Sequence, residues 1–285
     1  MGDLYLGLFV LTVLDAALFF AGRAVGRRVS TQKSNVVALL SIFAIITYAA
    51  CLWDNIVLAS FLPFSNLVVV GNWYLPVAGF LSGLVASQMN LGEGRRWLSA
   101  GGLQCAAFVT AIFPLLGSAP RCENQWDQTG ICFQTTPQTC SAASAATLLK
   151  MHGIEATEQE MAELCLTRHG TNWMGLYRGL KKKTAGTDWD VEVSACSANE
   201  LHAIHQPAIL SVGLPPTDDF DRRVQAEFGW TPGVRHSIVL LSFTNDDLVE
   251  IAEPTLGVGR ERWSVSSLHE FYLGQSIRLV RRNQR

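Results

Sequence analysis

Charged residues are distributed very unevenly along this chain, and that distribution limits what the chain can fold into. Residues 1–118 carry only ten Asp, Glu, Lys or Arg side chains, whereas the other 167 residues carry 36. Over the whole chain 16% of residues are charged, against about 25% in soluble domains, and 49% are apolar. The first part excludes a single soluble domain, and the apolar content excludes a disordered chain. We therefore expect two domains, residues 1–118 in a membrane and residues 119–285 in water.

The first part contains four apolar stretches close to the length that a helix needs to cross a bilayer, about 20 residues. They are residues 4–22, 36–53, 67–88 and 97–117. Residues 54–64 are too few to cross as a helix, and we expect an interfacial or re-entrant segment there. The first stretch differs from a cleavable signal peptide, because no basic residue precedes it and arginines follow it. The sequence thus predicts an α-helical transmembrane domain of about four spans.

The basic residues between these stretches predict the orientation, because Lys and Arg near span ends stay on the cytoplasmic side. Four follow the first stretch, two lie between the third and fourth, and none lies between the second and third. Both termini should then face away from the cytoplasm. We expect a multi-pass protein of the bacterial inner (cell) membrane whose second domain lies in the periplasm or outside the cell. The six basic residues are Arg23, Arg27, Arg28, Lys33, Arg95 and Arg96.

One acidic residue, Asp15, lies inside the first apolar stretch. A carboxylate in the hydrocarbon region is costly and usually faces a partner or water. A hydrogen bond to another helix, or a protonated acid, is the simpler interpretation, and a contact with a proton or a substrate is the alternative. No other stretch carries the acidic or histidine cluster expected of a transporter or an intramembrane protease.

Two cysteines flank a polar loop at the start of the second domain. Cys122 and Cys132 are ten residues apart, a separation that a disulfide can close, and disulfides persist in oxidising compartments. We therefore expect a Cys122–Cys132 bridge, which would agree with an outward-facing domain. Two unpaired thiols in a reducing cytosol are the alternative.

The remainder of the second domain predicts helices first and strands afterwards, which is typical of an α+β architecture with an antiparallel sheet. Thr157-Glu-Gln-Glu160 is a capping box that opens one of the helices, and residues 244–247 read as a hairpin turn. The expected helices are residues 141–151, a helix from 157, 172–183, 198–205 and 267–273. The expected strands are residues 191–195, 208–213, 236–243, 248–252, 260–265 and 276–281.

Cys140 has the sequence setting of a nucleophilic thiol. It lies where Gln134-Thr-Thr-Pro-Gln-Thr-Cys140 turns into an Ala-rich helix, and a helix N-terminus lowers the pKa of a thiol. By itself this position also fits a buried structural cysteine. His236 opens an apolar strand, and Glu253 ends the next strand, so adjacent antiparallel strands would bring an imidazole beside a carboxylate. Together the three residues follow the Cys–His–acid order of papain-like enzymes.

At this point the sequence resembles a family, the papain-like cysteine peptidases that trim double-glycine leaders from bacteriocins. The resemblance covers about residues 134–281. In that family a Gln six residues before the nucleophile supplies the oxyanion hole, and Gln134 stands six before Cys140. The other matching segments are Ala142-Ala-Ser-Ala-Ala, Met151-His-Gly, Pro207-Ala-Ile, His236-Ser-Ile-Val-Leu and Glu253-Pro-Thr-Leu-Gly257.

The sequence departs from that family in three respects. The residue after the nucleophile is commonly Gly and is Ser141 here, and the acid is commonly Asp and is Glu253 here. The longer Glu side chain needs a shifted strand or rotamer to orient an imidazole. Members fused to ABC exporters carry the peptidase in the cytosol beside an ATPase, whereas this chain has no Walker-A motif and an outward topology. Leader removal coupled to export is therefore not implied, and ATP is not expected.

The combined pattern predicts a membrane-anchored cysteine peptidase that cleaves a polypeptide, itself secreted or membrane-associated, through an acyl-enzyme. Cys140, His236, Glu253 and Gln134 are the expected site residues. A cysteine transpeptidase would use the same site, and a non-catalytic polypeptide-binding domain or a structural membrane scaffold are alternatives from other classes. No cofactor or metal is expected, and no nucleic-acid partner, because the net charge is −2 and no basic stripe is present.

The loop charges generate a test of topology. A reporter enzyme fused after Arg285 that works only outside the cytoplasm should be active, because an even number of spans returns the chain to the side on which it began. A reporter that works only in the cytoplasm should be silent at the same site. The opposite result would mean an odd number of spans.

Overall fold

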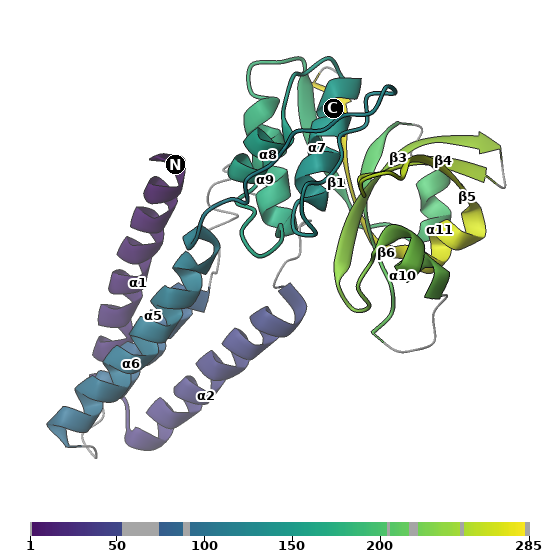
Figure 1. The fold of residues 1–285 in the computed structure, drawn as a ribbon. Helices are drawn as coiled ribbons and strands as arrows, with labels where there is room; N and C mark the ends of the chain where they lie inside the picture. Colours follow the sequence, from purple (N-terminus) through teal and green to yellow (C-terminus); the bar gives the residue numbers. More distant parts are fainter. Residues whose placement is uncertain are drawn as a thin grey trace. The chain divides into compact units, whose positions relative to one another are not determined.

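A computed structural model describes residues 2–52, 74–87, 92–203, 206–216, 222–245 and 248–282. These residues separate into two compact units, one that ends at Leu116 and one that begins at Gly117. Figure 1 shows helices throughout the first unit and a sheet with flanking helices in the second. Each unit has its own interior.

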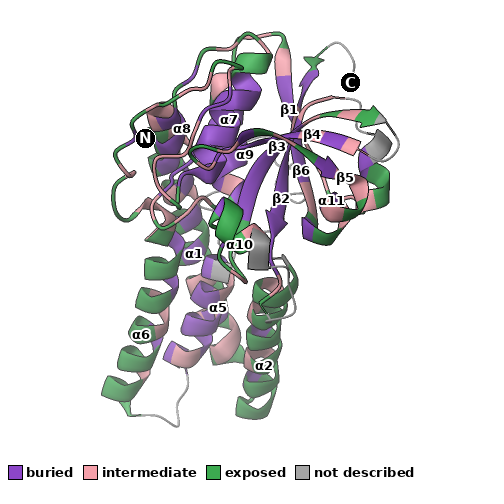
Figure 2. Ribbon diagram, turned by 45° about the vertical axis from the view of Figure 1, so that its right-hand side comes forward, coloured by how far each residue is buried: buried purple, intermediate pink, exposed green. Residues whose placement is uncertain are grey.

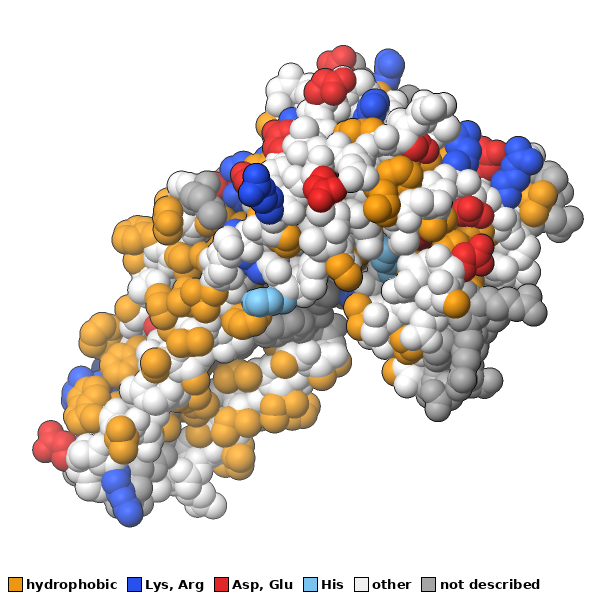
Figure 3. Space-filling model, in the orientation of Figure 1, with side chains coloured by type: hydrophobic (Ala, Val, Ile, Leu, Met, Phe, Trp, Pro, Cys, Tyr) orange, Lys and Arg blue, Asp and Glu red, His pale blue; other side chains and the backbone are white. Residues whose placement is uncertain are grey.

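The first unit consists of long apolar helices. These are α1 (Gly2–Arg28), α2 (Thr31–Thr47) with a π-helical continuation (Tyr48–Leu52), α5 (Tyr74–Ser87) and α6 (Glu93–Ile112) with a short 3-10 turn (Phe113–Leu115). Many of their large apolar side chains are exposed, such as Phe43 on α2 and Leu98 on α6. Figure 3 shows these hydrophobic side chains gathered over the helices. A surface of this kind is suited to lipid.

Among the residues that the structure describes, three helices are long and apolar enough to cross a membrane: Gly2–Arg28, Thr31–Cys51 and Glu93–Leu115. They coincide with the first, second and fourth predicted spans. The third predicted span falls partly on a shorter apolar helix, Leu75–Ser87, and partly outside the described residues. The predicted segment at 54–64 also lies outside them. Membrane association is thus supported by length and composition, and the count of four spans stays a prediction.

Helices α1 and α5 approach one another closely because glycines line their contact. A Cβ atom at Gly22 would collide with the carbonyl oxygen of Phe80, and one at Gly83 would collide with that of Phe19. Small residues that let two backbones meet are the usual packing device between helices in lipid, where apolar burial adds little. Figure 2 shows α5 coloured largely as buried, in agreement with a central place in this unit.

Asp15 has a partner on another helix of the same unit. The side-chain amide of Gln104 on α6 donates a hydrogen bond to its carboxylate. Asp15 is 9% exposed, and its carbonyl and carboxyl oxygens lie against Gly79 of α5. Asp15 therefore makes the interhelical hydrogen bond that is the simpler of its two interpretations.

The second unit is built on a six-stranded sheet in which all paired neighbours are antiparallel. Its strand order is β1-β6-β2-β3-β4-β5. The strands are β1 (Trp189–Ser194), β2 (Ala208–Gly213), β3 (Arg235–Asn245), β4 (Leu248–Glu253), β5 (Gly259–Ser264) and β6 (Tyr272–Arg281). The helices are α7 (Cys140–Met151), α8 (Glu158–Leu164), α9 (Trp173–Lys183), α10 (Arg222–Phe228), α11 (Val265–Phe271) and a 3-10 turn (Ala198–Ala203). The predicted α+β class with an antiparallel sheet is confirmed.

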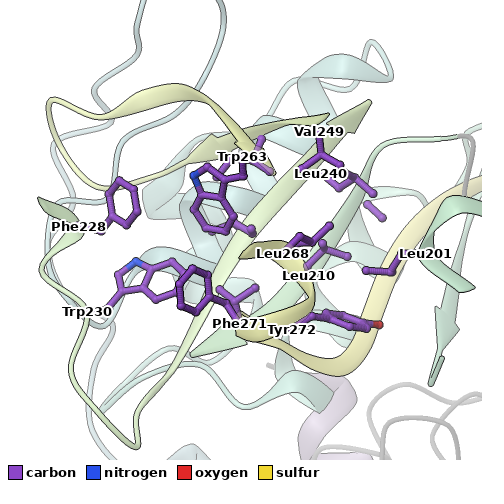
Figure 4. Packing of buried hydrophobic residues seen from close by; sticks show 14 of the residues in the cluster. Leu201, Leu210, Phe228, Trp230, Leu240, Val249, Trp263, Leu268, Phe271 and Tyr272 are labelled. Carbon is purple, nitrogen blue, oxygen red and sulfur yellow. The ribbon is translucent and has the colours of Figure 1, made fainter. Parts of the chain in front are cut away.

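The two faces of the sheet carry different cores because side chains alternate along a strand. On one face Leu210, Ile238 and Ile251 pack with aromatic residues and with α11. Figure 4 shows Trp230, Trp263 and Phe271 among the side chains of this cluster. On the other face α7 lies against β2 and β3. The strands are therefore buried on both sides at the centre, and Figure 2 shows them so coloured.

Most predicted elements of this unit are confirmed, and the reasons are local. Thr157 accepts a hydrogen bond from the backbone N–H of Glu160, which is one half of the predicted capping box, while the Glu160 carboxylate binds Lys183. Asn172 caps α9 through Met174. Three elements differ from expectation. The helix predicted at 198–205 is a 3-10 turn over Ala198–Ala203, and its last two predicted residues lie outside the described part of the chain. Helix α10 was not predicted, and β6 begins at Tyr272, four residues earlier than expected, because Tyr272 pairs with Val212 of β2.

The glycine contact generates a test. Gly83→Ala should destabilise the first unit by about 1–3 kcal/mol, because the added methyl group cannot fit against α1. Gly101→Ala on α6 is the matched control, since nothing lies within 4 Å of a Cβ there and alanine favours a helix by up to about 1 kcal/mol. Thermal unfolding in detergent micelles measures both. Equal shifts in Tm for the two variants would contradict the close α1–α5 contact.

Candidate functional site

Cys140 is the first residue of α7 and is 7% exposed. The residues that follow are small, and the four alanines between Ala142 and Ala146 are completely buried. Their size lets the helix lie directly on β2 and β3. The thiol is thereby held at a helix N-terminus, where unpaired backbone N–H groups favour a negative charge.

His236 and Glu253 form a buried hydrogen bond at the ends of neighbouring strands. Nε2 of His236 lies 2.8 Å from Oε1 of Glu253, and the two residues are 9% and 0% exposed. The imidazole also interacts with the thiol of Cys140. Because Nε2 is bound to the carboxylate, Nδ1 is the ring nitrogen left for the sulfur. The structure thus brings Cys140, His236 and Glu253 together in the expected order.

The thiolate of Cys140 and the imidazolium of His236 stabilise one another. Burial alone would lower the pKa of His236, but the charges of Glu253 and Cys140 outweigh it and raise that pKa to about 10. Burial alone would raise the pKa of Cys140, but the charge and hydrogen bond of His236 and further bonds from Ser237 and Ser141 lower it. The arrangement therefore favours a thiolate beside an imidazolium, which is the reactive state of a cysteine nucleophile.

Thr255, which the sequence analysis did not single out, fixes the carboxylate of Glu253. Its backbone N–H and its hydroxyl lie 3.1 Å and 2.7 Å from Oε1, the oxygen that also binds His236. Oε2 of Glu253 is buried and has no hydrogen-bond partner among the described residues. The turns in which a side chain binds the backbone two residues further on are those of Asn, Asp, Ser and Thr, so a glutamate at this position gave no such signal in the sequence.

Trp230 covers the ring of His236, with ring centroids 4.9 Å apart and an angle of 40° between the planes. It is 3% exposed and belongs to the aromatic cluster of the sheet (Figure 4). The imidazole is thus packed against an apolar surface on one side. No local pattern in the sequence pairs these two residues.

Gln134 is anchored close to Glu253 through its backbone. Its N–H donates to the carbonyl of Pro254 over 2.7 Å, and the next residue, Thr135, donates to the fully buried carboxylate of Glu158 over 2.7 Å and 2.6 Å. The side-chain oxygen of Gln134 is buried and has no hydrogen-bond partner within the described ranges. The segment before Cys140 is therefore tied to the residue that follows β4 and to the first residue of α8. Glu158 is a further residue that the sequence analysis missed.

The expected Cys122–Cys132 disulfide is not formed, and both residues are free thiols. Each sulfur instead lies near a main-chain oxygen, that of Pro120 for Cys122 at 3.6 Å and that of Phe133 for Cys132 at 3.8 Å. Burial, followed by the charge of Glu158, raises the pKa of both thiols to about 12. Both therefore stay protonated at neutral pH, and the bridge no longer supports an oxidising location.

Hydrogen bonds close this loop without a covalent link. The carboxylate of Asp127 accepts bonds from the backbone N–H groups of Thr129 and Ile131, each over 2.8 Å. The backbone of Asp127 also donates to Ile131, and Trp126 pairs with Cys132 as an isolated β-bridge. These bonds hold residues 126–132 in a tight turn.

A metal site has no support in the part of the chain that the structure describes. There, His, Cys, Asp and Glu side chains form no group of three or more that could hold a metal ion. The site chemistry that is present is that of a thiol, an imidazole and a carboxylate.

Comparison with known proteins gives similarities in structure only. No family model and no curated protein sequence matches the chain. The peptidase domain of Streptococcus ComA, a bi-functional ABC transporter involved in quorum sensing, is similar with 19% identity and a TM-score of 0.41, over 53% of this chain and 96% of that one. A double-glycine-motif protease from an AMS/PCAT transporter, in complex with a leader peptide, has 15% identity and a TM-score of 0.40, over 56% and 95%. The Streptococcus mutans ComA peptidase domain has 18% identity and a TM-score of 0.36, over 53% of this chain and 98% of that one.

The charge coupling generates a test on the thiol itself. His236→Ala should raise the pH midpoint of Cys140 alkylation by iodoacetamide, because burial is then no longer opposed by a neighbouring cation. Below that midpoint the variant should label more slowly than the wild type. Peptide mapping by mass spectrometry follows each cysteine separately, with Cys165 as the internal reference because burial raises its pKa to about 12. An unchanged midpoint would show that the imidazole does not act on the sulfur.

Proposed function

We propose that residues 119–285 form a cysteine peptidase domain, held at a membrane by residues 1–118, that cleaves a peptide bond in a polypeptide substrate. The observation that carries the proposal is the line of three side chains in which His236 contacts Cys140 on one side and binds Glu253 at 2.8 Å on the other. A buried carboxylate that orients an imidazole beside a thiol matches the requirements of nucleophilic catalysis.

In the first step the Cys140 thiolate attacks the carbonyl carbon of the scissile peptide bond. His236 enters this step as the imidazolium and donates its Nδ1 proton to the departing amine. The bond between carbon and nitrogen breaks, and a thioester joins the substrate to Cys140. Glu253 accepts at Nε2 throughout, so it stabilises the cation and keeps Nδ1 directed at the reacting atoms.

The negative oxygen of the tetrahedral intermediate needs donors that are already in place. We assign the backbone N–H of Cys140, which lies in the first turn of α7 and has no acceptor within the helix, as one donor. The side-chain amide of Gln134 is the second. Its support is the short bond of its backbone to Pro254, which holds the residue beside the strand end that carries Glu253.

Release of the product restores the enzyme. Neutral His236 removes a proton from water, the hydroxide attacks the thioester, and the carboxylic acid leaves as the thiolate re-forms. An amine in place of water would give transpeptidation at the same site. Hydrolysis is the reaction that needs no second substrate, and we assign it for that reason.

Catalysis is favoured over simple polypeptide binding by a contrast among the buried thiols. Burial raises the pKa of Cys122, Cys132 and Cys165 to about 12, whereas that of Cys140 is lowered. A binding domain gains nothing from ionising one sulfur. The thiolate is thus favoured at Cys140, which lies at a helix N-terminus beside an imidazole.

The membrane unit sets where this chemistry takes place. With four spans and the basic loops inside, the peptidase domain faces the periplasm or the exterior. Attachment to the bilayer raises the effective concentration of substrates that are membrane-bound or newly secreted. A membrane-associated or secreted polypeptide is therefore the proposed substrate class.

Cys140→Ala should abolish cleavage of a complex peptide library, and His236→Ala should lose a similar factor, on the order of a thousandfold or more, because the two act as a unit. Glu253→Gln should lose less, since it orients without reacting. Full-length protein in detergent, assayed by mass spectrometry of the products, gives these rates.

Cys105→Ala, at an exposed cysteine of α6, is the control and should cleave like the wild type. Equal cleavage by Cys140→Ala would contradict the assignment. A wild type that binds peptides and cleaves none would favour the non-catalytic binding domain instead.

A further inference from the structure

Buried serines occupy the contact between α7 and β3, directly behind the thiol. Ser141 and Ser144 lie three residues apart on α7 and so share a helix face, and Ser237 follows His236 on β3. The three are 4%, 1% and 1% exposed. Burial of a hydroxyl group at such a depth is costly unless a hydrogen bond compensates for it.

Ser237 links the helix to the strand at three points. Its hydroxyl lies 2.8 Å from that of Ser141, and its carbonyl accepts a hydrogen bond from Ser144 over 3.0 Å. Its backbone N–H bonds to the sulfur of Cys140, which also lies 4.0 Å from the hydroxyl of Ser141. The network therefore begins at the thiol and ends in the strand that carries His236.

We propose that Ser141 and Ser237 are positioning residues for Cys140: their linked hydroxyls hold a hydrogen-bond donor against the sulfur and fix the nucleophile relative to His236. This inference rests on the proposed peptidase function and adds two residues that act on the sulfur besides His236 and Glu253. The chain of contacts runs from Ser237 through Ser141 to Cys140.

Packing alone does not explain these hydroxyls. The neighbouring positions of α7 that are buried to the same degree hold Ala142, Ala143, Ala145 and Ala146. An alanine at position 141 would fit the same space and would avoid burying a hydroxyl. Ser141 and Ser144 are the positions of this part of α7 that bond Ser237. A hydroxyl group is therefore present where it has a hydrogen-bond partner.

A donor beside a sulfur stabilises its anion more than its neutral form. The bonds from the Ser237 backbone and the Ser141 side chain act in the same direction as the imidazole, and all three oppose the burial that would raise the pKa of Cys140. The charged groups that act on the sulfur are His236 and, behind it, Glu253. Neither changes when a serine is replaced, so the contribution of the hydroxyls can be measured separately.

Ser211 supplies a matched control. It is 0% exposed and stands opposite Ser237 in the register between β2 and β3, so the two lie on the same face of the sheet. Its hydroxyl has no hydrogen-bond partner among the described residues. Ser211→Ala thus removes a buried hydroxyl from the same layer and breaks no bond.

The test measures the rate of Cys140 alkylation by iodoacetamide against pH, in the full-length protein, by peptide mapping. In Ser141→Ala and in Ser237→Ala the pH midpoint of Cys140 alkylation should rise by about one unit. Labelling of Cys140 at low pH should then be about tenfold slower. Ser211→Ala should keep the wild-type midpoint. Ser237→Thr, which retains the hydroxyl, should also keep the wild-type midpoint.

If the wild-type midpoint is low and the midpoints of Ser141→Ala and Ser237→Ala equal it, this inference is overturned. The proposed function is then left intact. An equal rise in Ser211→Ala overturns it as well, because the effect would then be one of packing. A wild-type midpoint at the value of an ordinary thiol overturns both this inference and the proposed function.

Discussion

The hydrogen bond between His236 and Glu253 is the interaction on which the site depends. A carboxylate with no exposed surface is stable only with charged or hydrogen-bonded partners, and here one oxygen receives His236 and Thr255. The same bond keeps the imidazole charged and directed at Cys140. This hydrogen bond forms because the start of β3 and the end of β4 lie side by side in the sheet. The sheet therefore positions both residues.

The register of the sheet shows how the side chain of Glu253 reaches His236. Ala252 lies opposite Val239, so Glu253 is displaced along the strand from His236 and reaches it diagonally. The Glu253 side chain crosses that diagonal to bind Nε2 of His236. The hydroxyl of Thr255 holds the same carboxylate oxygen.

Local patterns carried much of what could be predicted. The capping box at Thr157, the helix that starts at Cys140 and the strands that bear His236 and Glu253 all have signals within a few residues, and each is found in the structure. Interactions between distant segments left no such signal. Glu158 accepts hydrogen bonds from Thr135, 23 positions away, and Trp230 packs against Trp263 and Phe271 of the aromatic cluster. The spacing of Cys122 and Cys132 predicted a disulfide, whereas both thiols are free and the loop between them contains a turn held by Asp127.

The bond from Gln134 to Pro254 joins main-chain atoms, and this has a consequence for how the protein can vary. A main-chain bond is indifferent to side-chain identity, apart from proline at position 134, which would remove the donor. Substitutions in both segments can therefore accumulate without moving one segment against the other. An insertion or deletion of a single residue between Gln134 and Cys140, or in the turn after Glu253, would shift the register of the two segments. Outside Gln134, Cys140 and Glu253, these two segments should tolerate changes of residue far better than changes of length.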